Sequence, residues 1–207
     1  MKIIYVHGLD SSARSMKGLL LERYCKHHHP EIQVLRPDLN QPPAEAFASL
    51  SSLVQQQQQA DSTVVLMGSS LGGYFSTLVS NETGCPAYLL NPSTQPYISL
   101  QRFIDDLQLT PDQLQPETVV YKTTGGWEIQ LKDLNWFAAH QLTSVKYPNK
   151  VAALIKEGDE LLDPQIATQF YRGEQATVTL QPGGDHRLTD FNQQLPLIME
   201  QIKTLIV

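Results

Sequence analysis

The chain has 207 residues, enough for one α/β domain with a sizeable core. Hydrophobic residues make up 41% and charged residues 17%, a globular balance that argues against a disordered or fibrous protein. The formal net charge of -6 provides no basic surface for nucleic acid or an anionic membrane, so we expect neither as a partner.

Short apolar runs alternate with helix-like segments along most of the chain. The expected strands cover residues 3–6, 33–36, 63–67, 87–90, 151–155 and 176–180, and the expected helices cover 14–28, 43–59, 71–81, 164–172 and 189–205. The runs at 63–67 and 151–155 are apolar enough to be buried on both faces, as in parallel sheets. This alternation predicts an α/β fold with a mostly parallel, doubly wound sheet of about six strands.

One region, from Asn91 to Asn149, interrupts this alternation before the fifth strand. It predicts a helix near 97–108, a hairpin around Gly125–Gly126 and a helix near 132–142. A small cap over an active site would lie at this point of the chain. A surface insertion without a functional role explains the segment nearly as well. We therefore expect a single domain over 1–207, with 93–149 as a candidate cap-like insertion.

The cysteines and the N-terminus bear on location. Cys25 and Cys85 lie in unrelated contexts without CxxC spacing, so neither a disulfide framework nor a structural zinc site is supported, and two unpaired thiols fit a reducing compartment. The apolar run at 3–6 is broken by His7 and Gly8, which makes it too short for a signal peptide, and no run approaches the ~18 residues of a membrane span. A cytoplasmic location is the default expectation.

The stretch Gly68-Ser69-Ser70-Leu71-Gly72 fits the pattern G-x-S-x-G between a buried strand and a helix. A nucleophile on such a turn has a strained backbone, and its neighbours must be small because the two arms of the turn approach closely. Ser70 occupies the apex and is the candidate nucleophile. The alternative is a tight turn in which Ser69 or Ser70 caps the helix.

The stretch "IIYVHGLDSS" places a His-Gly turn directly after the first strand. Acyl transfer creates an oxyanion that two backbone N–H groups can stabilise. The candidate donors are the N–H groups of Leu71, which follows Ser70, and of Leu9. His7 precedes the nucleophile and is expected to shape this loop rather than to act as the base.

A serine nucleophile needs a base and an orienting carboxylate, which follow it in the order acid, then histidine. His186, in the Gly-rich loop after the last strand, is the candidate base, and His140 is expected to be a packing or surface residue. Asp159, directly after the fifth strand, is the candidate acid. Asp163 is its main rival, although it also looks like a helix N-cap before proline. Asp185 is disfavoured because neighbours in sequence rarely point their side chains at each other.

No metal or cofactor is expected. The three consecutive histidines at 27–29 would point to different faces of a helix, unlike a pair of metal ligands. We expect them to lie at the C-terminal end of the first helix, where partial positive charge is favourable, rather than to bind a metal. No Walker-type loop or dinucleotide fingerprint stands out.

The segments "HGLDSS", "GSSLGG", "EGDELLD" and "GGDHRL", in this order after four strands, resemble an α/β-hydrolase, and more closely the small bacterial YqiA/YcfP-like esterases. The resemblance runs nearly end to end and is weakest over 110–150. It implies a serine esterase or thioesterase acting on small acyl substrates, with Ser70, Asp159 and His186 as its triad. Acyl transfer or amide hydrolysis on the same residues, or ligand binding without turnover, are the alternatives. Substrate, acyl length and oligomeric state are not legible in the sequence.

Overall fold

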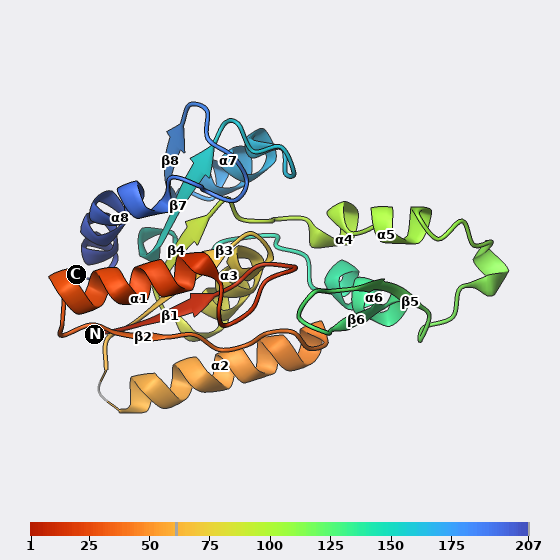
Figure 1. Ribbon diagram of the computed structural model, residues 1–207, viewed down its shortest axis with the longest axis horizontal. Helices are drawn as coiled ribbons and strands as arrows, with labels where there is room; N and C mark the ends of the chain where they lie inside the picture. The colour runs from red at the N-terminus through yellow and green to blue at the C-terminus, as the bar shows by residue number, and fades with distance from the viewer. Residues whose placement is uncertain (61, 207) are drawn as a thin grey trace.

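The computed structural model describes residues 1–60 and 62–206 (Figure 1). Six strands form one sheet in the order β2-β1-β3-β4-β7-β8, and every pairing in it is parallel. The strands are β1 (Lys2–Val6), β2 (Gln33–Leu35), β3 (Val64–Ser69), β4 (Ala87–Leu90), β7 (Val151–Lys156) and β8 (Thr177–Gln181). Each expected strand is found with its ends within about two residues, so the predicted parallel sheet is confirmed.

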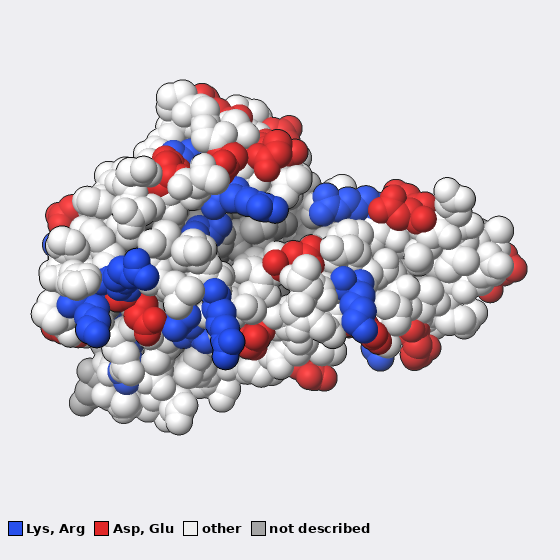
Figure 2. Space-filling model, in the orientation of Figure 1, with Lys and Arg blue, Asp and Glu red and all other residues white. Residues whose placement is uncertain are grey.

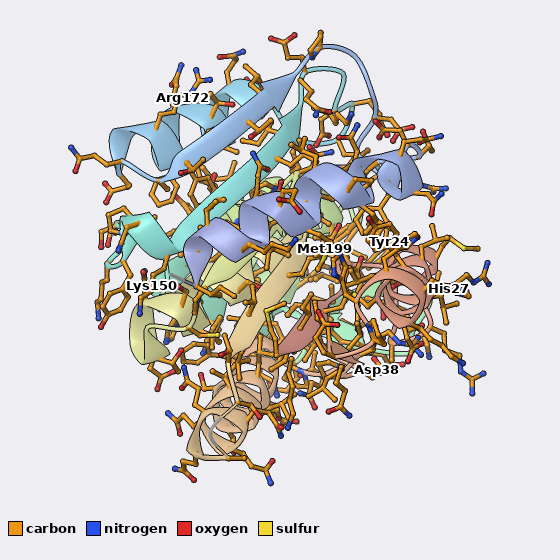
Figure 3. The ribbon with its side chains drawn as sticks, turned by 90° about the vertical axis from the view of Figure 1, so that its left-hand side faces the viewer. Tyr24, His27, Asp38, Lys150, Arg172 and Met199 are labelled. Atoms are coloured by element: carbon orange, nitrogen blue, oxygen red, sulfur yellow. The ribbon has the colours of Figure 1, made fainter. Side chains whose placement is uncertain are left out.

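Helices cover both faces of the sheet. The long helices are α1 (Met16–His28), α2 (Pro43–Gln59), α3 (Leu71–Thr83), α7 (Pro164–Gly173) and α8 (Phe191–Leu205). Figure 3 shows α8, with Met199, beside α1, with Tyr24, and side chains of both helices pack in one buried cluster. Helices α2, α3 and α7 contribute to the cluster on the opposite face.

Strand β1 contributes apolar side chains to both faces of the sheet. Ile3 and Tyr5 belong to the cluster under α1 and α8, whereas Ile4 and Val6 belong to the cluster under α2 and α3. Successive side chains of a strand point to opposite faces, so a strand that is apolar throughout must be covered twice. The uninterrupted apolar runs of the sequence therefore require the doubly wound arrangement.

The segment between β4 and β7 projects beyond the end of the sheet (Figure 1). It contains α4 (Pro96–Ser99), α5 (Arg102–Asp105), η1 (Pro111–Gln113), β5 (Val119–Lys122), β6 (Glu128–Gln130), α6 (Leu131–Ala139) and η2 (Pro148–Lys150). The expected hairpin is present as the antiparallel pair β5–β6. None of the described helices has the length and apolarity needed to cross a membrane.

The single helix expected over 97–108 is wrong, because two short helices stand in its place. At the break, Phe103 N–H donates to Leu100 O and Ile104 N–H donates to Gln101 O, which are the three-residue bonds of a tighter turn. This turn buries both Leu100 and Phe103, at 4% and 6% exposure. Burial of a pair spaced by three residues therefore replaces continuous α-helix.

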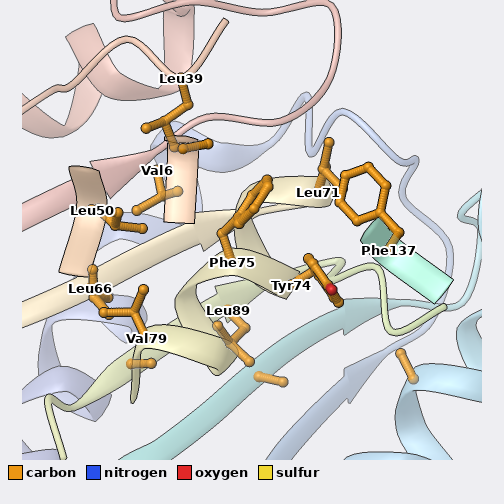
Figure 4. Packing of buried hydrophobic residues seen from close by; sticks show 14 of the residues in the cluster. Val6, Leu39, Leu50, Leu66, Leu71, Tyr74, Phe75, Val79, Leu89 and Phe137 are labelled. Atoms are coloured by element: carbon orange, nitrogen blue, oxygen red, sulfur yellow. The ribbon is translucent and has the colours of Figure 1, made fainter. Parts of the chain in front are cut away.

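The projecting segment shares a core with the sheet (Figure 4). Phe137 of α6 packs against Tyr74 and Phe75 of α3, with ring centroids 5.6 and 6.0 Å apart. Tyr74 Oη also donates to the carbonyl oxygen of His140. Contacts of this kind fix the projecting segment on the start of α3.

The strand-to-helix turn after β3 depends on the absence of a side chain at Gly72. A Cβ at this position would lie 2.1 Å from Val6 O and 2.6 Å from His7 O, both backbone atoms of the neighbouring strand and its loop. We expect Gly72→Ala to lower the free energy of unfolding by at least about 1–3 kcal/mol, because the backbone must move to admit the methyl group.

Urea denaturation measures this loss, and Gly173→Ala is the matched control. Gly173 ends α7, and a Cβ there meets no atom within 4 Å. It should be neutral or slightly stabilising, since alanine favours helix. Equal stability of the two variants would contradict the crowding at Gly72.

A second support joins the end of β7 to the start of α8. The Nζ of Lys156, whose side chain is 4% exposed, lies 2.5 Å from Oδ2 of Asp190 and donates to Oε1 of Gln181. Partial burial raises the pKa of Asp190, but hydrogen bonds from Lys156 and Gln194 and the charge of Lys156 outweigh it and lower the pKa below 3.8. The folded protein therefore favours the ionised carboxylate.

We expect Asp190→Asn to destabilise the protein at neutral pH, because it leaves the buried Lys156 ammonium without its counter-charge. The pKa of Asp190 is lower in the folded than in the unfolded protein. Its contribution to the free energy of unfolding is therefore complete above pH 3.8 and lost as the pH falls through the folded pKa. The gap in unfolding free energy between wild type and variant should therefore shrink in acid. Glu200→Gln, which breaks an exposed pair with Lys203, should change stability little at any pH.

Candidate active site

The order of the strands brings two loops together at one edge of the sheet. From β1 the chain passes to β2 on one side and then crosses to β3 on the other, so the loops that follow β1 and β3 separate at this point. Such switch points open a crevice at the carboxyl ends of parallel strands. The loop after β1 contains His7 to Ser12, and the turn after β3 contains Ser70.

Ser70 has the backbone geometry of the predicted strained apex. Its φ is 55° and its ψ is -121°, a conformation that residues with a side chain rarely adopt. Ser70 N–H donates to Leu90 O, and Ser93 N–H donates to Ser70 O, each at 3.0 Å. A Cβ at Gly68 would lie 2.4 Å from Gly72 O, which explains why position 68 carries no side chain.

Three polar side chains from separate loops form one chain of hydrogen bonds. Ser70 Oγ lies 2.9 Å from His186 Nε2, and His186 Nδ1 lies 2.7 Å from Asp159 Oδ2. The second oxygen of Asp159 accepts from the N–H groups of Leu161 and Leu162. The side chains of His186 and Asp159 are 11% and 2% exposed, so both are largely withdrawn from water.

The rival acids are engaged elsewhere. Asp163 accepts from Gln165 N–H as the N-cap of α7. Asp185 accepts from both the N–H and the hydroxyl of Thr189. The carboxylate that contacts the His186 ring in the described part of the chain is therefore that of Asp159.

The remaining histidines have local partners. Leu39 N–H donates to His7 Nε2, and His7 Nδ1 lies 2.9 Å from the carbonyl oxygen of Gly8, so this ring braces the loop after β1. The ring of His140 stacks on Trp136 at 3.9 Å. Residues 27–29 end α1, and over the described residues no group of three or more His, Cys, Asp or Glu side chains is arranged to hold a metal ion.

The two cysteines are buried and free, and neither lies at the site. Burial raises the pKa of the Cys25 thiol to about 11 and that of the Cys85 thiol to about 12. Both thiols therefore stay protonated and unreactive near neutral pH.

A cavity of about 500 Å³ opens in front of Ser70 and His186. Leu9 and Leu71, the two candidate oxyanion donors, both line it. Within the described residues, neither of their N–H groups donates a hydrogen bond to another part of the chain. Two residues whose N–H groups are unused therefore line a cavity that Ser70 also lines.

Asn91, which the sequence analysis did not single out, anchors the His186 loop. It follows β4 with φ of 41° and is 2% exposed. Its Nδ2 donates to the carbonyl oxygens of Asp185 and His186, and its Oδ1 accepts from Lys156 N–H. An asparagine directly after a buried strand, where it tolerates positive φ, was the available signal.

Asp10 is a second residue that the motif analysis passed over. Its carboxylate accepts from Tyr121 Oη at 2.7 Å and from Thr124 N–H at 3.0 Å. These bonds tie the loop after β1 to the β5–β6 hairpin.

Solved structures with the same fold are esterases and a serine hydrolase. Est1E from Butyrivibrio proteoclasticus superposes with a TM-score of 0.72 at 17% identity, over 98% of this chain and 85% of that one. The esterase domain of a Rhodothermus marinus protein gives 0.63 at 15% identity, over 98% and 84%. XC6422 from Xanthomonas campestris, described as an α/β serine hydrolase without a lid, gives 0.58 at 14% identity, over 97% and 81%.

At these identities the likeness establishes the fold, and the predicted α/β-hydrolase fold is confirmed. A family model supplies the closer relationship. The model described as "Uncharacterised protein family (UPF0227)" matches residues 2–203, nearly the whole chain. The chain therefore belongs to this family, the YqiA/YcfP family to which its four motifs pointed.

Proposed function

We propose that this protein is a serine hydrolase that cleaves carboxylic ester or thioester bonds of small acyl substrates. The observation that carries the proposal is the continuous hydrogen-bonded chain from Asp159 through His186 to Ser70, which ends at a cavity of about 500 Å³. A buried carboxylate, an imidazole and a hydroxyl in this sequence form the arrangement that activates serine for attack on a carbonyl carbon. The esterases among the solved structures of the same fold support this reading.

Each of the three side chains has one role in the proposed reaction. His186 Nε2 takes the proton of Ser70 as its Oγ attacks the carbonyl carbon, and Asp159 stabilises the imidazolium that forms. The imidazolium returns the proton to the leaving oxygen or sulfur, which yields an acyl-enzyme and a free alcohol or thiol. Water, deprotonated by the same imidazole, then attacks the acyl-enzyme and releases the acid and Ser70.

The N–H groups of Leu9 and Leu71 are the proposed oxyanion donors. Both residues line the cavity, and neither N–H group donates a hydrogen bond to another described residue. Removing one such donor typically costs ~3 kcal/mol of transition-state stabilisation. His7 and Asp10, which brace the Leu9 loop from both sides, are its proposed positioning residues.

We further propose that residues 93–149 act as a cap within a single domain over 1–207. Pro96, Leu100 and Arg102 of this segment line the cavity, and the hairpin is bonded to Asp10. Because its buried side chains belong to the same cluster as those of the sheet, the segment is held on the core rather than linked loosely to it.

Replacing the nucleophile tests the mechanism directly. We expect Ser70→Ala to lower kcat for p-nitrophenyl butyrate at least about 10³-fold while the fold is retained, because among the described residues no other hydroxyl is bonded to the His186 ring. Wild type should also gain a covalent fluorophosphonate adduct on Ser70, located by peptide mass spectrometry. An unlabelled Ser70 together with unchanged hydrolysis by the variant would refute the proposal.

The choice of acid is tested by the same substitution at two positions. Asp159→Asn should lower kcat roughly 10³-fold or more, because the amide cannot stabilise the imidazolium and favours the wrong tautomer. Asp163→Asn should change kcat no more than a few-fold, since Asn also caps a helix well. The steady-state rates of the two variants decide the assignment, and a reversed order would move the role of the acid to Asp163.

A further inference from the structure

The cavity in front of Ser70 is lined by more positive than negative charge. Three cationic side chains adjoin it, Lys17 of α1, Arg102 of α5 and Arg187 of the His186 loop, against the single carboxylate of Asp10. Figure 2 shows Lys and Arg side chains on the rim of the hollow between the sheet domain and the projecting segment. The chain as a whole carries a net charge of -6, so composition does not account for this excess.

None of these three cations is neutralised by a carboxylate within ion-pair distance in the described part of the protein. Lys17 Nζ donates to the backbone carbonyl of Arg187 at 2.8 Å. The guanidinium of Arg102 lies over the Phe103 ring at 5.1 Å. These contacts position the cations but leave their charge uncompensated.

Three carboxylates around the cavity are already hydrogen-bonded. Each oxygen of Asp10 accepts a hydrogen bond from the β5–β6 hairpin, and the Asp185 carboxylate accepts twice from Thr189. Glu160 accepts from the backbone N–H of His186. The pKa of Lys17 is lowered to about 8, chiefly by burial. The charge of Asp185 opposes this shift, and the charge of Arg187 adds to it. An anion bound beside Lys17 would relieve this unfavourable placement of an ammonium group.

The position of the cations relative to His186 indicates which part of a substrate they would meet. In the proposed reaction His186 protonates the leaving oxygen or sulfur, so the leaving group departs on the side of this ring. Arg187 is the next residue, and Lys17 is bonded to its carbonyl. Lys17 and Arg187 therefore adjoin the path of the alcohol or thiol part.

A separate groove of about 130 Å³ suits the acyl part. It shares Leu161 and Leu162 with the cavity and lies between α4 and the start of α7. Ile98, Leu161 and Ile166, which line it, are large apolar side chains that are 55%, 52% and 43% exposed. An apolar acyl chain would cover this surface.

We propose that the natural substrate carries an anionic group, a phosphate or a carboxylate, on its alcohol or thiol part, and that Lys17 and Arg187 bind this group. The inference rests on the proposed ester or thioester hydrolysis at Ser70. Arginine and lysine side chains on an anion form charge-assisted hydrogen bonds, which are stronger than those to a neutral oxygen.

A matched set of four butyrate or acid-bearing esters tests the proposal. The probes are 4-butyryloxybenzoate, its uncharged methyl ester, 4-butyryloxyphenyl phosphate, and the hemiglutarate of methyl 4-hydroxybenzoate, which keeps the leaving group of the methyl ester and places the carboxylate on the acyl part. Wild type should cleave the first or third probe with kcat/KM at least about 10-fold above that of the methyl ester, mainly through a lower KM. Raising NaCl from 20 to 500 mM should shrink this preference. The two anionic leaving groups separate carboxylate from phosphate recognition.

Charge-removing variants locate the binding residues. Lys17→Gln and Arg187→Gln should each reduce the ratio of anionic to neutral kcat/KM severalfold, and the double variant should bring it close to one. Arg172→Gln removes an exposed cation from α7, labelled in Figure 3, that does not line the cavity, and it should leave both rates unchanged.

Three outcomes would overturn the proposal. Anion binding on the leaving-group side would be refuted by equal kcat/KM for the charged and methyl esters, by a preference for the hemiglutarate, or by a ratio of anionic to neutral kcat/KM that the double variant retains. In each case hydrolysis at Ser70 would still stand. Failure of wild type to cleave any probe, with no fluorophosphonate adduct on Ser70, would instead remove the proposed function and this inference with it.

Discussion

The backbone of Ser70 is the constraint on which the rest of the site depends. A residue with a side chain at φ 55° and ψ -121° is held there at a cost of order 1–3 kcal/mol, which neighbouring structure must offset. The bonds to Leu90 and from Ser93 hold the peptide groups on both sides of it, and the closely packed glycines at 68 and 72 let α3 start against β1. If any of these supports were absent, the chain could relax into an ordinary turn, and the hydroxyl would leave the cavity.

The same requirement for support extends to the partners of Ser70. His186 lies in a loop without regular structure, yet its backbone is bonded by Asn91 after β4 and by Glu160 after β7. The Lys156–Asp190 pair closes the far end of that loop onto β7. Each support comes from a strand end or its loop. The sheet therefore holds the His186 loop, which has no regular secondary structure. This is the arrangement in which side chains from distant loops stay within hydrogen-bond distance.

The sequence was most informative where one local rule decides the outcome. Buried strands appear as uninterrupted apolar runs, and the turn between β3 and α3 appears as glycines around Ser70. Crowding in the strands and in the turn admits few residue types. The candidate residues at 70, 159 and 186 could be named because each follows a strand at the same sheet edge. Asn91, Asp10 and the Lys156–Asp190 pair could not, since their roles depend on which loops meet in space. The break at Leu100 was missed for the same reason, because tertiary burial rather than helix propensity decided it.

The charges around the site follow a different logic from those that stabilise the fold. Lys156 is buried and fully engaged by Asp190 and Gln181, so its charge holds structure together. Lys17 is only half-buried, and within the described residues its ammonium is bonded to a backbone carbonyl and to no carboxylate, while burial lowers its pKa to about 8. Partial desolvation of a cation that has no counter-charge disfavours its charged form. Two further uncompensated cations line the same cavity. An anion supplied by the substrate is the group that would make this placement favourable, and it would do so only while the substrate is bound.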